Sequence, residues 1–231
     1  MQIATLRSFE RLKAKLQMKK SICIVLTCVV LNGFAQIITS QQVLSPDSLI
    51  VFDHQAGFYT NAFQLKINAP LATDSLVYTL DGSNPYTSKR RFIATGMASI
   101  SINPDDTTGR GKTPAVVVKA SLLRNGLLAP HPFSHTFIFP DKVMTQGYPG
   151  GKWPQGAVNG QVLDYEMDPN VVNDAAYSGE MLDALMSFPS ISISSDLDNL
   201  FNRTTGIYVN ADSRGDSWER ECSTELLNPD G

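Results

Sequence analysis

Residues 76–85, which read LVYTLDGSNP, contain a strand and a turn, and this combination predicts the fold of the chain. The first five residues are aliphatic, aromatic or β-branched, kinds that are enriched in strands. Asp81 and Gly82 supply the positive φ that a reversing chain needs, and the Ser-Asn pair after them can hydrogen-bond to local backbone. Pro85 then stops the strand, because proline has no N–H to donate. The stretch therefore predicts a β-strand that ends in a structural turn.

The same combination of strand and turn recurs on both sides of this stretch. FQLKI and ASISI alternate apolar and polar side chains with period two, which is typical of half-buried strands. We expect strands at residues 63–67, 76–80, 98–102, 115–123 and 134–139. Short strands at this spacing predict an antiparallel, immunoglobulin-like β-sandwich over residues 45–140. Its core is expected to contain Phe63, Leu65, Tyr78, Val117 and Phe137, and the polar residues 103–114 are expected to form an exposed loop.

Four blocks of this region resemble the small β-sandwich found at the C-terminus of chitobiase and β-hexosaminidase. The blocks read AGFYTNAFQLKI, YTLDGSNP, VVVKASLLRNGLLAP and SHTFIF, and their order and spacing match that module. The module also occurs beside family-29 glycoside hydrolases and in many secreted bacterial proteins. The resemblance implies a non-catalytic accessory domain with a structural signature turn at Asp81, Gly82, Ser83 and Pro85. The loop at residues 103–114 is longer than the resemblance would lead us to expect.

After Pro140 the composition changes. Residues 141–160 are rich in Gly and Pro, which predicts a linker or an irregular packed crossing. Beyond it we expect a helix over 178–188, a strand at 191–194, a short helix over 195–201 capped by Ser195 or Asp196, and strands at 206–210, around Trp218 and at 223–227. Trp218 is expected in the core. The fold class is therefore mainly β: a sandwich followed by an incomplete α+β segment over residues 161–231.

This second region resembles the opening segment of proteins that contain a CotH domain, the spore-coat kinase family. The resemblance lies in DYEMDPNVV, in ALMSFPSISISSDLDNLF and in GIYVNADSRGDSWERECSTELLNPDG. It implies that a kinase core follows, with its nucleotide and catalytic residues after residue 231, so ATP and a divalent metal would belong to that part and no cofactor to this one. Asp230 and Gly231 form a hairpin-turn dipeptide with no returning strand after it. We therefore interpret the chain as an N-terminal fragment of a longer protein.

The N-terminus has the plan of a secretory signal peptide. Met18 and two lysines precede an apolar run, and Gly33 and Ala35 after it are the small residues of a cleavage site before Gln36. We expect cleavage between Ala35 and Gln36, with residues 1–17 as upstream sequence before the true start. The apolar run is shorter than the roughly 20 residues that a membrane span needs, although a retained signal anchor is the alternative interpretation. The protein is therefore expected to be secreted or held at the cell surface, and to have no membrane contact after cleavage.

Charge and cysteine content restrict the partners. The whole chain has 19 Lys and Arg against 22 Asp and Glu, and residues 1–35 hold six of the basic residues and one of the acidic residues. The remaining residues therefore have 13 basic and 21 acidic side chains, a balance that argues against nucleic acid as a partner. Cys222 is the one cysteine outside the predicted leader, so it cannot form an intrachain disulfide, and we expect it to be buried.

No set of residues forms a complete catalytic or metal site, so we expect no catalytic, cofactor-binding or metal-binding residue in this chain. Asp164, Glu166 and Asp168 alternate and could face one side of an extended segment, but acids in such patterns are more often solvated. His131 and His135 are four residues apart in a region predicted to be a strand, which keeps them off a common helix face. Arg214, Gly215 and Asp216 match an adhesion tripeptide that is short enough to occur by chance.

The function predicted from sequence is that of a non-catalytic accessory sandwich in a secreted multidomain bacterial protein, placed before a CotH-like kinase domain. The alternative is a carbohydrate-binding module of a cell-surface glycoside hydrolase, binding glycan through exposed aromatic residues such as Tyr59 or Tyr86. A spacer or adhesin module is a third interpretation. The expected partners are accordingly a cell-surface glycan or a protein.

Overall fold

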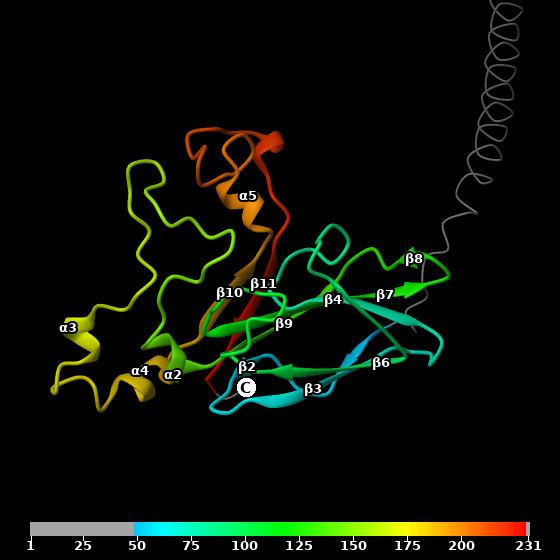
Figure 1. The fold of residues 1–231 in the computed structure, drawn as a ribbon, viewed down its shortest axis with the longest axis horizontal. Helices are drawn as coiled ribbons and strands as arrows, with labels where there is room; N and C mark the ends of the chain where they lie inside the picture. Colours follow the sequence, from blue (N-terminus) through cyan, green and yellow to red (C-terminus); the bar gives the residue numbers. More distant parts are fainter. Residues whose placement is uncertain (1–48, 230–231) are drawn as a thin grey trace, which may run out of the picture. The chain divides into compact units, whose positions relative to one another are not determined.

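The strands predicted within residues 45–140 form two sheets that pack face to face, so the fold is mainly β (Figure 1). This computed structural model describes residues 49–229. The predicted leader, with its cleavage site at Ala35 and Gln36, and the turn at Asp230 and Gly231 lie outside the described residues.

The smaller sheet has the order β1-β3-β6 and is antiparallel throughout. It consists of β1 (Val51–Phe52), β3 (Phe63–Asn68) and β6 (Met97–Ile102). On β3, Leu65 and Ile67 are fully buried, while the alternate residues Gln64, Lys66 and Asn68 are exposed. The period-two pattern of the sequence thus gives one face to the core and one to solvent.

The larger sheet has the order β2-β9-β7-β4-β5, and β8 pairs with the end of β7. Its strands are β2 (Gly57–Phe58), β4 (Ser75–Thr79), β5 (Phe92–Thr95), β7 (Ala115–Arg124), β8 (Leu127–Leu128) and β9 (Phe133–Ile138). Its pairs are antiparallel apart from β2 with β9, which is parallel. The β7–β8 hairpin turns at Asn125 and Gly126, both with positive φ, as the Asn-Gly dipeptide predicts.

The core lies between the two sheets. Leu65 and Phe137 are fully buried as predicted, but Phe63, Tyr78 and Val117 are only partly buried. The prediction for Val117 is wrong because β7 is covered on both faces. Its core residues are Val116, Val118, Ala120 and Leu122, so Val117 points to the opposite face.

The loop at residues 103–114 is not simply an exposed connection, because it folds around a buried arginine. Arg110 is 6% exposed, and its guanidinium donates to six backbone carbonyls, those of Asn103, Pro104, Asp106, Gly111, Thr113 and Ala115. Burial lowers the pKa of Arg110, while nearby acidic residues oppose that shift. Although the loop is polar in composition, its backbone carbonyls converge on the buried guanidinium of Arg110.

Residues 140–189 are mostly irregular and contain three short helices. These are α2 (Pro140–Val143), α3 (Pro169–Val172) and α4 (Met181–Ser187). The apolar residues on one face of α4, Met181, Leu182, Leu185 and Met186, are each half-buried. The Gly- and Pro-rich stretch packs through Trp153, whose ring lies 5.9 Å from that of Tyr165 and 6.1 Å from that of Phe201. It is therefore a packed crossing.

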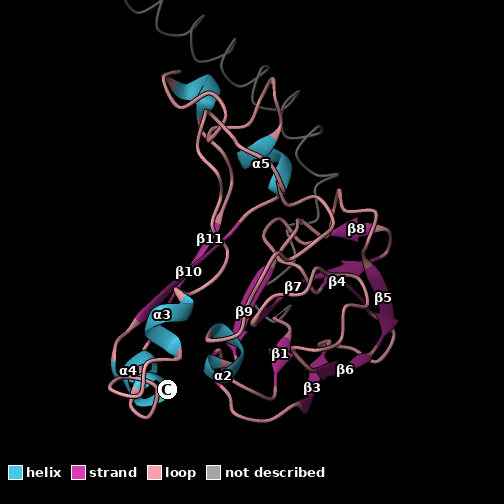
Figure 2. Ribbon diagram, turned by 60° about the vertical axis from the view of Figure 1, so that its left-hand side comes forward, coloured by secondary structure: helices cyan, strands magenta, loops and turns pink. Residues whose placement is uncertain are grey.

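The C-terminal region is built on a two-stranded antiparallel ribbon of β10 (Ser190–Ser194) and β11 (Ser223–Leu227), which we call the ribbon (Figure 2). The excursion between its strands contains α5 (Leu197–Phe201) and a 3-10 turn at Asp216–Trp218. Helices α3 and α4 lie near one end of the ribbon and α5 near the other. The strand predicted at residues 223–227 is confirmed, and its partner is the earlier strand β10.

Two predictions for the excursion are wrong. Residues 206–210 form turns instead of a strand, because the N–H groups of Gly206, Ile207 and Tyr208 donate to carbonyls of residues 199–202. Trp218 is not on a core strand; it is half-buried in the 3-10 turn, and the guanidinium carbon of Arg220 lies 5.5 Å from its ring centroid. In this region the backbone N–H groups donate hydrogen bonds to nearby carbonyls instead of pairing with another strand.

Candidate functional site

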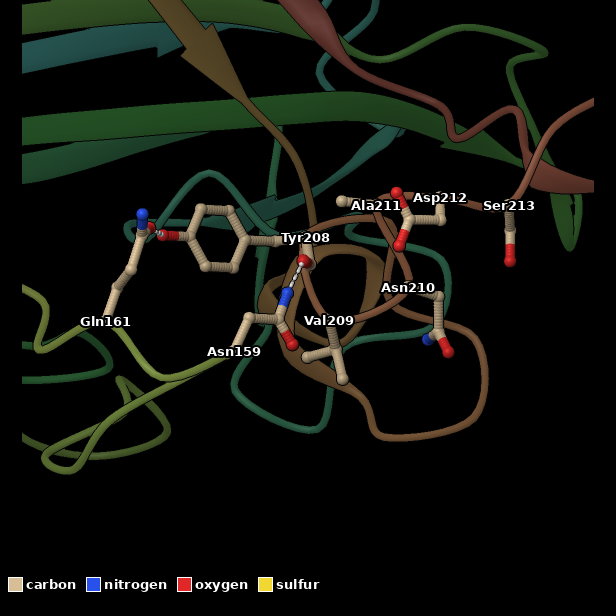
Figure 3. A pocket seen from close by; sticks show the side chains of 8 residues that line it. All are labelled: Asn159, Gln161, Tyr208, Val209, Asn210, Ala211, Asp212 and Ser213. Carbon is tan, nitrogen blue, oxygen red and sulfur yellow. Dashed lines mark hydrogen bonds between the residues drawn. The ribbon is translucent and has the colours of Figure 1, made fainter.

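One concave feature of the C-terminal region is a pocket between two loops, with a volume of about 670 Å³ (Figure 3). One loop contributes Asn159 and Gln161, and the other contributes residues 208–213. We call this the amide pocket, because three of its eight lining residues are Asn or Gln: Asn159, Gln161, Tyr208, Val209, Asn210, Ala211, Asp212 and Ser213.

The first loop is a tight turn. Val158 and Gln161 pair through both of their backbone hydrogen bonds, and Asn159 and Gly160 between them have φ of 53° and 76°. Asn and Gly are the residues that adopt positive φ most readily, so the Asn-Gly dipeptide specifies this turn. The turn presents the two amide side chains to the pocket.

The second loop is fixed by its contacts with α5. Gly206 packs so closely that a Cβ there would lie 2.4 Å from the carbonyl oxygen of Leu200. The side-chain nitrogen of Asn210 donates to the carbonyl oxygens of Arg203 and Gly206 at 3.2 and 2.9 Å. These bonds hold the loop without regular secondary structure.

Hydrogen bonds also connect the two loops across the pocket. Asn159 Nδ2 donates to the carbonyl oxygen of Tyr208 at 2.6 Å, and the Tyr208 hydroxyl donates to Gln161 Oε1 at 3.3 Å, as Figure 3 shows. The Tyr208 ring also packs on Phe201, with centroids 5.6 Å apart. The position of the pocket walls is therefore set by contacts that exist without a ligand.

Sequence reasoning missed this pocket. Asn159 and Tyr208 are 49 residues apart, and the lining residues form no spacing motif. The one signal available was the Asn-Gly dipeptide at residues 159–160, which indicates a tight turn but says nothing about what the turn faces.

A second feature is the polar contact between the ribbon and the outer face of β7 and β9, which we call the seam. The carboxylate of Glu225 accepts hydrogen bonds from the Thr136 hydroxyl at 2.6 Å, from the Thr136 N–H at 3.3 Å and from the Ser134 hydroxyl at 3.3 Å. The hydroxyls of Thr136 and Ser192 are 2.7 Å apart. Thr136 is 1% exposed, so the ribbon excludes water from this part of the sheet.

Lys119 lies in the same seam and is 4% exposed. Its ammonium group donates to the carbonyl oxygen of Ser194 at 3.5 Å. Burial lowers the pKa of Lys119, and the carboxylates of Glu221, Asp196 and Glu225 act in the opposite direction. A lysine enclosed beside three acidic residues is held there by charge as well as by packing.

The predicted signature turn also belongs to the seam. Asp81 Oδ1 accepts from the Ser83 N–H at 3.1 Å and hydroxyl at 2.5 Å, which is a local turn contact. Gly82 has φ of 71°, and a Cβ at that position would lie 3.0 Å from side-chain atoms of Val117 and Ser194. Pro85 is fully buried.

Asn84, within the same turn, reaches the C-terminal region directly. Its N–H donates to Asp196 Oδ1 at 2.7 Å, and its side-chain nitrogen donates to Glu221 Oε2 at 3.3 Å. Asp196, predicted as a helix cap, thus makes its carboxylate bond to the turn and no capping bond to α5.

The other residues considered from sequence are not brought together. Asp164 and Asp168 each accept a hydrogen bond from an N–H two residues ahead, and Asp168 caps α3. His135 stacks on Phe52 with ring centroids 4.1 Å apart. Within residues 49–229, no group of three or more His, Cys, Asp or Glu side chains could hold a metal ion. In the same part of the chain, the helices are all too short or too polar to cross a membrane.

The tyrosines considered for glycan binding are half-buried. Tyr59 donates to the carbonyl oxygen of Gln55 at 2.7 Å, and Tyr86 donates to the carbonyl oxygen of Ala129. Burial raises the pKa of both hydroxyls. The prediction for Cys222 is wrong, because its side chain is exposed on the segment leading into β11.

Comparison with known proteins gives no family for this chain. No protein-family model matches the sequence, and no curated protein matches it.

Proposed function

We propose that this chain is the N-terminal part of a secreted multidomain bacterial protein, in which a non-catalytic β-sandwich carries and positions a CotH-like kinase domain. The sandwich contributes a rigid surface, and the ribbon connects that surface to the kinase core. ATP and a divalent metal would then be bound by the core, after residue 231.

The observation that supports this proposal is that the apolar side chains of β10 face away from the sandwich, while its polar side chains face toward it. On β10 the serines face the sandwich, whereas Ile191 and Ile193 are 67% and 70% exposed. Leu226 on β11 pairs with Ile191 and is 64% exposed. Apolar side chains on a strand normally lie on its covered face, so this arrangement favours a ribbon with a layer on each side. The sandwich is one layer, and the kinase core is the proposed other.

The polar seam supports the positioning role. Glu225, Lys119 and Asn84 form contacts that depend on orientation, since hydrogen bonds require defined distances and angles. An apolar contact alone would tolerate sliding of the ribbon on the sheet, whereas these bonds fix its register. The ribbon can therefore hold a domain that packs on its outer side in a fixed orientation relative to the sandwich.

The test is to read the gene downstream of the codon for residue 231 and to express the longer protein from a secreting host. We expect a kinase core that consumes ATP with Mg²⁺, and a mature N-terminus at Gln36. A reading frame that continues into a glycoside hydrolase would contradict the proposal and favour the carbohydrate-binding alternative. Retention of residues 1–17 on the secreted protein would contradict the start and cleavage prediction.

A Glu225→Gln variant of the longer protein tests the positioning role separately. We expect faster hydrogen exchange in β10 and β11 and a lower turnover of ATP. Asp183→Asn, on the exposed face of α4, is the matched control that removes a carboxylate elsewhere. Unchanged exchange in the ribbon of the Glu225 variant would contradict the role assigned to the seam.

A further inference from the structure

We propose that the amide pocket binds a neutral sugar unit of an oligosaccharide. This inference goes beyond the accessory role above and does not depend on it. It rests on three properties of the pocket: its size, the hydrogen-bonding groups that its walls present, and its charge.

The size is appropriate for a small ligand. Its volume of about 670 Å³ lies within the roughly 300–1,000 Å³ that is usual for small-molecule sites. The pocket opens to solvent between its two loops, since Asn159, Gln161 and the residues from Ala211 to Ser213 are exposed. An open site of this kind can hold one unit of a chain while the rest of the oligosaccharide stays in water.

The side chains that line the pocket have hydrogen-bond donors and acceptors that are not used in hydrogen bonds within the protein. Asn159 and Asn210 use their side-chain nitrogens in bonds to backbone carbonyls, which leaves both Oδ1 atoms as acceptors. Gln161 accepts through Oε1 from Tyr208, which leaves its amide nitrogen as a donor. The side chains of Asp212 and Ser213 have no hydrogen-bond partner within the described part of the chain.

This combination matches the hydroxyl groups of a sugar. Each sugar hydroxyl both donates and accepts, so a site for it needs acceptors and donors close together. Carboxylate and amide side chains provide them, and the carboxylate of Asp212 can accept from two neighbouring hydroxyls. The hydrogen bonds of Asn159, Gln161 and Asn210 hold their amide groups in place before a ligand arrives, which lowers the entropy lost on binding.

The charge of the pocket excludes an anionic ligand. Its lining contains the carboxylate of Asp212, and none of its eight lining residues is Lys or Arg. A phosphate, nucleotide or sulfated glycan would therefore meet repulsion without a compensating cation. A neutral sugar has the required hydrogen-bonding groups without the charge.

The experiment is calorimetric titration of the 231-residue chain with neutral oligosaccharides. The probes are hexamers of β-1,4-linked glucose, xylose and N-acetylglucosamine and of α-1,4-linked glucose, with ATP as the anionic comparison. We expect saturable binding of at least one neutral hexamer with a dissociation constant of about 1 mM or tighter, and none of ATP. Binding of ATP alone, or of no neutral hexamer, would overturn the proposal.

Two substitutions test whether the pocket is responsible. Asp212→Asn and Ser213→Ala change exposed side chains that have no internal hydrogen bond, so the fold should be retained. We expect each to weaken binding, Asp212→Asn by about tenfold because it removes a charged acceptor. Asp183→Asn, which removes an exposed carboxylate on α4, should leave binding unchanged.

A hexamer that binds equally well to wild type and to the Asp212 and Ser213 variants would overturn the assignment to this pocket. That outcome would indicate a sugar site elsewhere, for example on the sandwich. It would leave the accessory role of the sandwich untouched, so failure of the two proposals can be distinguished.

Discussion

Asp74 is a buried acidic residue of the sandwich. It is 2% exposed, and its carboxylate accepts from Arg124 Nε and Nη2 at 2.7 Å each and from the Leu71 N–H at 3.1 Å. The hydrogen bonds from Arg124 are the main reason that the pKa of Asp74 lies below its usual value; the Leu71 bond adds to this effect and burial opposes it. The pair connects the start of β4 to the end of β7.

We predict that this carboxylate makes the stability of the fold depend on pH. A pKa that is lower in the folded state stabilises the fold above the unfolded value of about 3.9, and this contribution is lost as the pH falls through the lower folded value. Asp74→Asn should therefore melt several degrees lower than wild type at pH 7 and lose less stability between about pH 5 and pH 3. Thermal melting at pH 7 measures the first effect, and urea unfolding at a series of pH values from about 5 to 3 measures the second. An unchanged pH slope would contradict the assignment, and Asp183→Asn provides the control.

At the scale of elements, the alternation of apolar and polar side chains in the sequence predicted the longer strands of the sandwich. β3, β6, β7 and β9 have at least six residues each, and each begins and ends within two residues of the predicted bounds. The two-residue strands β1, β2 and β8 span a single period of two residues, so no repeat could reveal them. For the ribbon, alternation separated the serines from the isoleucines correctly. It could not tell which face is covered, because the usual rule assigns the apolar face to the core.

The segment at residues 206–210 shows a different limit. GIYVN has the composition of a strand, yet its N–H groups are taken by carbonyls of α5 and the residues after it. The reason lies in Gly206, which allows a backbone approach that no other residue permits. The amide pocket depends on this close backbone approach. Because its two loops are distant in sequence, no local sequence pattern indicates the pocket.

We predict that Gly206→Ala disrupts this region selectively. The added Cβ would lie 2.4 Å from the carbonyl oxygen of Leu200 and 2.6 Å from backbone atoms of Asn202, so the backbone itself must move. We expect a destabilisation of about 1–3 kcal/mol and faster hydrogen exchange in residues 199–213. Gly179→Ala is the matched control, because a Cβ there meets no atom within 4 Å. Equal exchange in the two variants would contradict this interpretation.

At the scale of the whole molecule, residues 49–229 belong to one compact unit, although composition changes sharply at Pro140. The fully buried large side chains all lie between residues 65 and 139. The C-terminal region contributes Leu227 to the buried apolar residues, and its other contacts with the sandwich include the polar bonds of the seam, the hydrogen bond from the Lys112 N–H to the Pro149 carbonyl oxygen and the ion pair of Lys142 with Asp105. The apolar core is thus concentrated in the first half of this unit.

We predict that residues 45–140 fold cooperatively when expressed alone. Their core is complete, and the face uncovered by removal of the ribbon carries Lys119, Ser134 and Thr136, which water can solvate. The expected result is a single sharp thermal transition by circular dichroism, at a lower temperature than that of residues 45–231. A broad transition would mean that the sandwich needs the ribbon in order to fold, and that the boundary at residue 140 is misplaced.

The buried guanidinium of Arg110 has a consequence for proteolysis. Trypsin must draw an arginine side chain into its own specificity pocket before it can cut, and in this chain Arg110 is enclosed by six carbonyls of its loop. The bond between Arg110 and Gly111 is therefore protected in the native state, despite the polar composition around it. Arg214, in an exposed turn before the 3-10 helix, has no such protection. Limited digestion should cut at Arg214 in the folded protein, and a cut at Arg110 would report that the sandwich has opened.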